Sequence, residues 1–452
     1  MNKLCVWSTL VVCVAWVSSV ALAQTSFTDY NDVHHVLAFL SDVLPAELKS
    51  SDLSVRRNAW PGWVVVHDRD IRERLLRGDE DTIVNWLLFG TSFSKQAAAF
   101  SDGLPTLVSR RIRDFISALA SADREERTVF ARRLLLGQGY KLDTPEERAR
   151  LEGHLWAEIE RVIAERRQYM LREDAFPKGD TVEQIMVQST LFRDRGLSLD
   201  TSILASFAIE QALEKMSSDH LLPPGRIRRV ALIGPGLDFA DKNSGYDFYP
   251  VQTVQPFTSI DSLLRLGLAA GPDEIELTTL DISPRVNNHI IDIGNRAKTG
   301  APYILRLPTE AGSPWTPGLI SYWKRVGDQI GAVTPAPRPP DMVKGIEVRA
   351  IEVRPQIVSR ITSADFNVVT EAWKGTPFDL VIATNVLVYY DSLDQALAFA
   401  GIESMLRPGG FFLTNNVVVE LPVSRLRSVG IVTVQHSAEK VDHVFWYRRS
   451  QE

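Results

Sequence analysis

The stretch RIRRVALIGPG, residues 226–236, decides how the rest of this chain is interpreted. Its apolar run Val230–Ile233 has the composition of a strand buried on both faces, and Gly234-Pro235-Gly236 ends that run abruptly. Glycine has no Cβ and tolerates positive φ, so backbone N–H groups in such a turn can approach a ligand. The same three residues are also ordinary turn residues. The stretch therefore predicts a buried strand, a glycine turn and a helix close behind it.

Length and composition indicate a folded protein with more than one domain. The chain has 452 residues, of which 45% are hydrophobic and 23% are charged, close to the averages of globular proteins. One core of ordinary size does not organise so many residues, so we expect two domains. The formal net charge of -6 gives no electrostatic basis for binding nucleic acid.

The first residues resemble a secretory signal. Lys3 precedes an almost wholly apolar run at residues 4–22, and Ala21-Leu22-Ala23 resembles a signal-peptidase site before Gln24. We expect a signal peptide at residues 1–23 and an exported protein, periplasmic or secreted. If cleavage fails, the apolar run is long enough to anchor the chain in a membrane.

Cysteine and histidine usage does not indicate a metal site. Cys5 and Cys13 are the two cysteines and both lie in the signal segment, so a mature chain would have no disulfide and no cysteine nucleophile. His34 and His35 are adjacent and point apart on a helix, and no pair of histidines has the spacing of zinc ligands.

The pattern from Thr28 to about Ser217 is helical, and we expect residues 24–222 to form an all-α N-terminal domain. Thr28 is a candidate N-cap for the first helix, and Gly90 is expected to end another. Thr144 is the N-cap of the clearest helix, which carries an apolar stripe. Residues 63–66 are a candidate strand.

The period of the apolar residues changes at the prolines of residues 221–225, where we place the domain boundary, so that residues 223–452 form an α/β domain. Segment 303–355 does not fit the repeat and is expected to be an insertion. Strands are predicted at 229–233, 275–280, 357–363, 378–384, 410–415, 430–435 and 443–448, and helices at 259–268, 284–297 and 393–406. The first of these helices follows a capping-box pattern that begins at Thr258. The last two strands are close enough in sequence to pair as an antiparallel hairpin.

Polar side chains follow three of the predicted strands. Asp281 ends one strand, where a carboxylate can accept hydrogen bonds from both hydroxyls of a ribose. Asp365 follows another strand and can accept a hydrogen bond from an exocyclic amine, and Asn385 ends the most apolar strand. The carboxyl ends of parallel strands meet at one edge of a sheet, so these residues and the glycine turn predict one ligand crevice. Each carboxylate alone is more often a cap or turn residue, and it is their common order after strands that favours a ligand site.

Residues 228–448 resemble a class I S-adenosylmethionine-dependent methyltransferase domain. The block FDLVIATNVLVYYDSLDQALAFAGIESMLRPGGFFLTNN, residues 378–416, is similar to the fourth strand, helix and Arg-Pro-Gly-Gly strand of that superfamily. Within it, NVLVYY at residues 385–390 is similar to chemotaxis-receptor (CheR-type) methyltransferases. The resemblance implies a Rossmann-like, mostly parallel seven-stranded sheet, S-adenosylmethionine as cofactor, and methyl transfer to an acceptor that the sequence does not identify.

The resemblance also implies roles for individual residues. The residues expected at the cofactor are Gly234, Pro235, Gly236, Asp238, Asp281, Ile282, Asp365, Phe366 and Asn385. Tyr389 and Tyr390 are expected at the substrate, although tyrosines in an apolar turn are more often packing residues. No catalytic base is identifiable, because transfer from a sulfonium depends mainly on alignment.

Two positions depart from the superfamily pattern. Leu232 stands where an acidic residue is usual, and Asp238 stands where a third glycine is usual. If Asp238 points into the crevice, it repels the carboxylate of the cofactor; if it caps the following helix, it does not. We expect the cap.

Two alternative functions stay open at this stage. The domain could be a non-catalytic binding or scaffold module, because of Leu232, Asp238 and export away from the cytoplasm, where the cofactor is made. More remotely, Ser92-Phe93-Ser94-Lys95 and Lys298-Thr299-Gly300 fit two motifs of acyl-serine enzymes, but no Ser-Asp-Asn lies between them.

Export makes a prediction about the mature chain. Protein recovered from an exporting host should begin at Gln24, because Ala21-Leu22-Ala23 precedes it. Intact-mass spectrometry measures this directly. Recovery of a chain that retains Met1 from the cytoplasm would refute the prediction.

Overall fold

The computed structural model describes residues 25–96, 105–122, 124–174, 192, 195–240, 247–310, 312–341, 343–418 and 420–451. The predicted signal peptide at residues 1–23, including both cysteines, lies outside the described residues. Among the helices that are described, none is long and apolar enough to cross a membrane.

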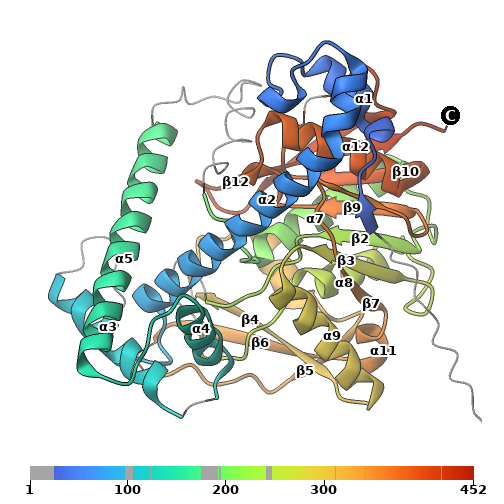
Figure 1. Cartoon of the computed structure of the whole chain (residues 1–452). Helices are drawn as coiled ribbons and strands as arrows, with labels where there is room; N and C mark the ends of the chain where they lie inside the picture. The colour runs from blue at the N-terminus through green and yellow to red at the C-terminus, as the bar shows by residue number, and fades with distance from the viewer. Residues whose placement is uncertain are drawn as a thin grey trace, which may run out of the picture.

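A seven-stranded sheet forms the centre of the molecule, with the strand order β11-β12-β10-β9-β2-β3-β7 (Figure 1). Its strands are β2 (Arg229–Ile233), β3 (Glu276–Asp281), β7 (Ile361–Asp365), β9 (Phe378–Ala383), β10 (Leu406–Thr414), β11 (Leu426–Gln435) and β12 (Val441–Arg449). The sheet contains five neighbouring parallel strands, β7, β3, β2, β9 and β10, whereas β12 is antiparallel to both β10 and β11. The predicted mostly parallel sheet with a C-terminal antiparallel hairpin is confirmed.

Helices α1 to α7 precede the sheet in sequence, and the later helices lie between its strands. They are α1 (Tyr30–Phe39), α2 (Leu53–Phe89), α3 (Pro105–Ala120), α4 (Glu126–Gly137), α5 (Pro145–Asp174), α7 (Ile203–Ser218), α8 (Gln255–Arg265), α9 (Pro284–Lys298), α10 (Pro317–Arg325), α11 (Pro355–Val358) and α12 (Ser392–Met405), with short 3₁₀ turns η1 (Ala46–Leu48) and η2 (Leu387–Tyr389). Gly90 ends α2 as predicted. Thr144 Oγ1 accepts a hydrogen bond from the N–H of Glu147 at 3.3 Å, which also agrees with its predicted capping role.

Two predictions in the N-terminal half are wrong. The N-cap of α1 is Asp29, whose Oδ1 accepts a hydrogen bond from the N–H of Asn31 at 2.8 Å, so Thr28 does not cap that helix. Residues 63–66 are helical and lie inside α2. Val64 is buried there whereas Val65 and Val66 are exposed, so the helical period overrides the preference of valine for strands.

Three predictions in the second half also need correction. The strand predicted at 357–363 begins at Ile361, because Ile357 belongs to the turn of α11. The helix predicted at 259–268 begins at Gln255, so Thr258 lies inside α8 and is not its cap. Between the glycine turn and α8, the described residues contain no helix, so the helix predicted close behind the turn is not found there.

Asp238 does not cap a helix in the described part of the chain, so that prediction is wrong. Its N–H donates a hydrogen bond to the carbonyl oxygen of Gln252 at 2.7 Å. Its Oδ2 accepts a second hydrogen bond from Nε2 of Gln252 at 2.8 Å. The segment after the glycine turn thus returns as a short antiparallel bridge.

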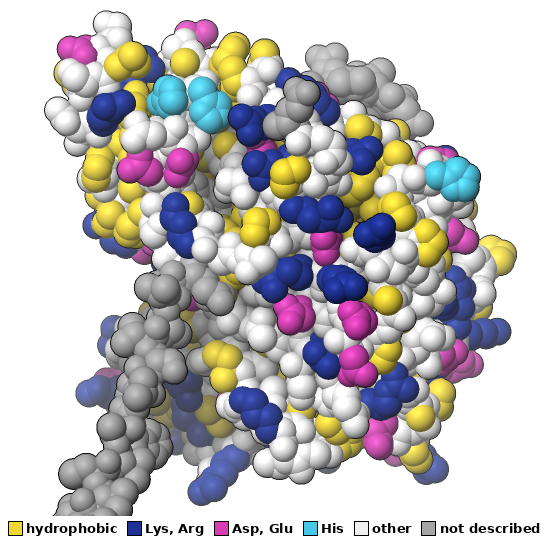
Figure 2. All heavy atoms as spheres, turned by 90° about the vertical axis from the view of Figure 1, so that its right-hand side faces the viewer, with side chains coloured by type: hydrophobic (Ala, Val, Ile, Leu, Met, Phe, Trp, Pro, Cys, Tyr) yellow, Lys and Arg dark blue, Asp and Glu magenta, His cyan; other side chains and the backbone are white. Residues whose placement is uncertain are grey.

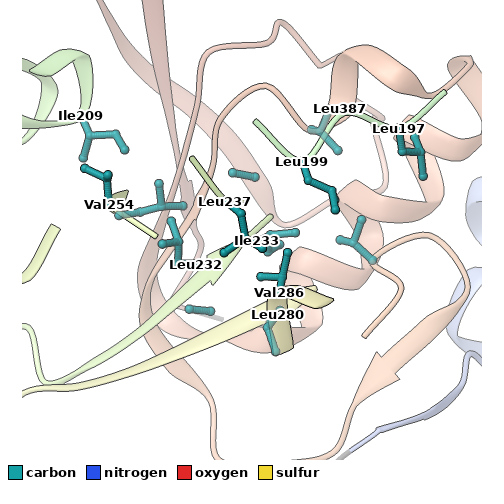
Figure 3. Close-up of a cluster of buried hydrophobic side chains, with 14 of the residues drawn as sticks. Leu197, Leu199, Ile209, Leu232, Ile233, Leu237, Val254, Leu280, Val286 and Leu387 are labelled. Atoms are coloured by element: carbon teal, nitrogen blue, oxygen red, sulfur yellow. The ribbon is translucent and has the colours of Figure 1, made fainter. Parts of the chain in front are cut away.

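The two halves of the chain are joined by strand pairing and by a shared hydrophobic core. Strand β1 (Thr25–Phe27) pairs with β8 (Glu371–Trp373), so the described part of the N-terminal half has one strand besides its helices, and this strand joins the C-terminal half. The hydrophobic core is also continuous: Figure 3 shows Leu197 and Leu199, which precede α7, near Ile233 and Leu387 of the sheet domain. The predicted boundary near residue 222 falls between α7 and β2 and stays a prediction.

Residues 303–353 form a three-stranded antiparallel sheet of their own, in the order β4-β6-β5. Its strands are β4 (Tyr303–Glu310), β5 (Gly331–Thr334) and β6 (Ile346–Val353).

On the face of the molecule shown in Figure 2, Lys and Arg side chains are interspersed with Asp and Glu, so this face carries no continuous field of one sign.

Helix α2 runs diagonally in front of the sheet, and a network of charges attaches it there (Figure 1). Arg72 donates to Oδ2 of Asp68 at 2.9 Å and to Oδ1 of Asp365 at 2.8 Å. Asp68 is buried and also accepts hydrogen bonds from Asn367 at 2.8 Å and Thr370 at 2.7 Å. These bonds connect one helix of the N-terminal half to the segment that follows β7.

A second set of contacts connects α2 to the segment that follows β9. Arg74 donates to the carbonyl oxygen of Tyr389 at 2.7 Å and to that of Arg195 at 3.1 Å. His67 Nε2 lies 2.6 Å from Oδ1 of Asp394 on α12. Helix α2 is therefore held against the carboxyl edge of the sheet at both β7 and β9.

Two glycines of α2 provide a matched test of this packing. A Cβ at Gly78 would overlap the carbonyl oxygen of Leu197, whereas a Cβ at Gly62 would have no neighbour within 4 Å. Gly62→Ala should raise the free energy of unfolding by about 0.5–1 kcal/mol, since glycine is unfavourable inside a helix. Gly78→Ala should lower it by about 1–3 kcal/mol, because the backbone of Leu197 must move. Urea unfolding measures both, and a Gly78→Ala variant as stable as Gly62→Ala would disprove the close contact.

Candidate functional site

A pocket lies at the carboxyl ends of β2, β3 and β9. Strand β2 is placed between β3 and β9, which is where the order of the strands along the chain reverses. Ligands of open α/β sheets bind at such points. The structure brings together in the lining of this pocket the predicted residues Gly234, Gly236, Asp281, Ile282, Phe366, Asn385, Tyr389 and Tyr390. Pro235, Asp238 and Asp365 were also predicted at the cofactor but do not line the pocket.

Asp281 is the buried carboxyl group in the lining of the pocket. It is the last residue of β3, and its side chain is buried. The N–H of Ser283 donates to Oδ1 at 2.7 Å, while Oδ2 has no hydrogen-bond partner among the described residues. Burial, together with the charge of Asp365, raises the pKa of Asp281 to about 7. One oxygen of this carboxyl group is therefore available to a ligand hydroxyl.

The glycine turn has the backbone conformation that was predicted for it. Gly234 and Gly236 have φ values of +64° and +66°, which side chains other than glycine rarely adopt. The space that each leaves is filled by this chain itself. A Cβ at Gly234 would lie 2.6 Å from Cγ2 of Val386, and one at Gly236 would overlap the carbonyl oxygen of Leu199. Glycine is thus required here for internal packing.

Residues 197–200, hereafter the 197–200 segment, lie directly on the glycine turn. The N–H of Leu237 donates to the carbonyl oxygen of Leu199 at 2.6 Å, and the N–H of Leu197 donates to that of Arg74 at 3.1 Å. Together with Leu75 of α2, this segment covers the pocket. The volume left open is about 70 Å³, below the several hundred Å³ of ordinary ligand pockets. A volume of this size does not hold a nucleoside.

Leu75 and the 197–200 segment were not among the predicted site residues, because they belong to the helical half of the chain. A usable signal was Gly78, since a glycine inside a helix usually has a packing reason. A Cβ at Gly196 would lie 2.5 Å from the backbone nitrogen of Gly78, so two glycines meet where the segment crosses α2.

Asp365 has a different environment from Asp281. It ends β7 in register with Asp281 on β3, as predicted for two strand-end carboxylates. Its side chain, however, forms an ion pair with Arg72 at 2.8 Å and is 58% exposed. The pairing directs this carboxylate toward α2, so the structure gives it a role in attaching that helix.

Asn385 adopts an uncommon conformation at the pocket. Its φ is +57°, and non-glycine residues with positive φ concentrate at functional sites and tight turns. Its N–H donates to Oδ1 of Asn415 at 2.8 Å, and Nδ2 of Asn415 donates to Oδ1 of Asn385 at 2.7 Å. Asn415 follows β10 and was not predicted from the sequence. This reciprocal pair fixes the amide of Asn385 at the mouth of the pocket.

The two tyrosines have packing contacts. Tyr390 is buried, and the guanidinium of Arg74 lies 6.0 Å from the centre of its ring. Tyr389 packs against Phe192 with ring centroids 5.8 Å apart. Both side chains line the pocket, so they are placed to contact a ligand.

Ser92, part of the acyl-serine motif, belongs to a structural network. Its hydroxyl donates to Oδ2 of the buried Asp247 at 2.6 Å. Asp247 also accepts hydrogen bonds from Trp86 Nε1 at 2.7 Å and from the Thr91 hydroxyl at 2.6 Å. The carboxylate thus fixes the end of α2, and Ser92 is bonded to it rather than to a lysine.

No family model and no curated protein sequence matches the chain. Among solved structures, it is similar to the N-methyltransferase NodS from Bradyrhizobium japonicum WM9 in complex with S-adenosyl-l-homocysteine, with 14% identity, 60% of this chain and 99% of that chain covered, and a TM-score of 0.27. It is also similar to TrmN from Thermus thermophilus, with 11% identity, 58% of this chain and 52% of that chain covered, and a TM-score of 0.26. A third similar structure is a putative sarcosine dimethylglycine methyltransferase from Galdieria sulphuraria, with 8% identity, 54% of this chain and 85% of that chain covered, and a TM-score of 0.28. At these values, conclusions about this chain depend on its own strands and side chains.

Proposed function

We propose that the pocket binds S-adenosylmethionine and that the chain is an S-adenosylmethionine-dependent methyltransferase. The observation that carries the proposal is the position of Asp281, buried at the end of β3 beside the glycine turn of β2, with one carboxyl oxygen available. A carboxylate at this position accepts hydrogen bonds from ribose hydroxyls in nucleotide-binding α/β sheets. The sequence resemblance of residues 228–448 supports the same ligand.

Some residues of the pocket are placed to contact the nucleoside part of the proposed ligand, and others stand where the methyl acceptor approaches. Asp281 holds the ribose, and the apolar side chains of Ile282 and Phe366 flank the base. Asn385 and Tyr389 stand at the mouth, where the acceptor approaches. When bound, the cofactor supplies a methyl group on a sulfonium, and the task of these residues is to orient it and exclude water.

The fit is incomplete at the methionine part of the cofactor. The space over Gly236, expected for the methionine part, holds the backbone of Leu199. We infer that the described conformation is closed and that the 197–200 segment leaves the glycine turn when the cofactor enters. Within the superfamily, the local similarity of residues 385–390 favours the chemotaxis-receptor type.

A second candidate function is a non-catalytic binding or scaffold module. The observation that favours it is the same closure, since a pocket filled by the Leu199 backbone does not need a cofactor to be stable. The proposed export of the chain also favours it, because the cofactor is made in the cytoplasm. The two candidates differ in one measurable property, which is the affinity for the cofactor or its product.

Asp281 predicts how that affinity depends on pH. With a pKa of about 7, roughly a tenth of the carboxyl group is ionised at pH 6 and roughly nine-tenths at pH 8. Because the ionised form accepts both ribose hydrogen bonds, affinity for S-adenosylhomocysteine should increase about tenfold over this range. Isothermal titration calorimetry at both values measures the change.

Two variants complete this test. Asp281→Asn should bind about tenfold more weakly at pH 8, with no dependence on pH, since a charge-assisted hydrogen bond is lost. Asp238→Asn is the matched control and should bind like the wild type, because Asp238 contacts Gln252 outside the pocket. No binding by the wild type at either pH would favour the non-catalytic module. Equal binding by Asp281→Asn would place the ribose elsewhere.

The unliganded protein provides an independent prediction about the same group. The folded state retains a proton on Asp281 that the unfolded state releases near pH 3.8, the ordinary value for this group. Stability contributed by the raised pKa is therefore lost as pH rises from about 4 to about 7. Asp281→Asn should lose less stability than the wild type over that interval in urea unfolding. Parallel pH profiles for the two proteins would show that the carboxyl group titrates normally.

A further inference from the structure

A second pocket lies apart from the first and shares no lining residue with it. It is formed by the first residue of α4, the second half of α9, the start of β4 and the residues just before α8. Its volume is about 750 Å³, within the range of small-molecule sites. Nothing in the proposed methyltransferase function uses it.

One wall of this pocket contains a histidine, and its hydrogen bonds define which ring nitrogen carries the proton. The hydroxyl of buried Tyr303 accepts a hydrogen bond from the N–H of Thr253 at 2.9 Å and lies 3.0 Å from Nε2 of His289. Among the described residues, only His289 can accept the hydroxyl proton of Tyr303, so Nε2 is the acceptor. Burial lowers the pKa of His289 to about 4, so the ring is neutral and its one N–H is at Nδ1. Nδ1 is thus a fixed donor at the pocket, 4.0 Å from Oε1 of Glu126.

The pocket also contains charges of both signs that are not paired with each other. Arg296 and Asp292 lie one turn apart on α9, and neither forms an ion pair in the described part of the chain. Burial lowers the pKa of Arg306 and raises that of Glu126, so both charged forms are incompletely hydrated. Charges removed from water are stabilised by partners of opposite sign.

Apart from the amide of Asn295, the remaining surface of the pocket is apolar and comes from Pro250, Val251, Pro302 and Ile304. Two guanidinium groups, two carboxylates and an apolar wall suit a ligand that carries both charges on an apolar body. A polyanion such as a nucleotide would instead meet the carboxylates of Glu126 and Asp292. The balance of charges therefore selects a molecule with no net charge.

We propose that this pocket binds a small zwitterion, an amino acid or a short peptide. Its carboxylate is held by Arg296, Arg306 and the Nδ1–H of His289, and its ammonium group by Glu126 and Asp292. The side chains of the ligand lie against the apolar wall. Free amino acids and short peptides share this chemistry and differ in length, which an experiment can separate.

The test is calorimetric titration of the full chain with the dipeptide Leu-Leu and, separately, with leucine. Binding is expected for at least one, and the tighter of the two identifies the length that fits. Acetyl-Leu-Leu lacks the ammonium group and Leu-Leu amide lacks the carboxylate. Each should bind about tenfold more weakly than Leu-Leu, since each loses a charge-assisted contact. Equal binding of either capped probe, or no binding of Leu-Leu and leucine at about 5 mM, would overturn the proposal.

Variants locate the binding. Arg296→Gln should weaken binding of the better probe about tenfold, because this guanidinium is an anchor for the carboxylate. Arg110→Gln is the matched control, an exposed arginine on α3 that does not line the pocket. Asp281→Asn should leave this affinity unchanged, which separates the second pocket from the proposed cofactor site. Unchanged binding by an Arg296→Gln variant with wild-type thermal unfolding would place the probe elsewhere.

Discussion

The ion pairs of Arg72 are the interaction on which the arrangement of the two halves depends. This guanidinium bridges Asp68 of its own helix and Asp365 at the end of β7, and it lies 3.5 Å from Glu371. A partly buried cation with several carboxylate partners is costly to separate from them, because each would be left without a counter-charge. Helix α2 is consequently fixed across the carboxyl edge of the sheet, where ligands of such sheets bind.

This position of α2 explains the small volume of the pocket. The helix supplies Leu75 to the pocket and holds the 197–200 segment through Arg74 and the contact at Gly78. The N-terminal half thus covers the site. Any cofactor that enters must offset the loss of these contacts, so its measured affinity is reduced by the population of the closed form.

Local patterns predicted the sheet well, because buried parallel strands are short apolar runs ended by polar residues. Asp281 and Asn385 reach one edge for this reason. The patterns failed where distant contacts decide the structure. Val64 and its neighbours have the composition of a strand but form one turn of a long helix. Asp238 pairs with Gln252, 14 residues further along the chain, instead of capping a helix. The 197–200 segment was not predicted, and Gly78 inside α2 was the one signal that pointed to a close contact there.

The most direct measurement of the central claim is a crystal structure of the chain with S-adenosylhomocysteine bound. The account predicts that the ribose hydroxyls contact Asp281, that the adenine lies beside Phe366, and that the 197–200 segment has moved away from Gly236. A ligand bound elsewhere would contradict it. So would a ribose at Asp281 with the backbone of Leu199 still on the glycine turn, because the closed pocket would then be the binding form.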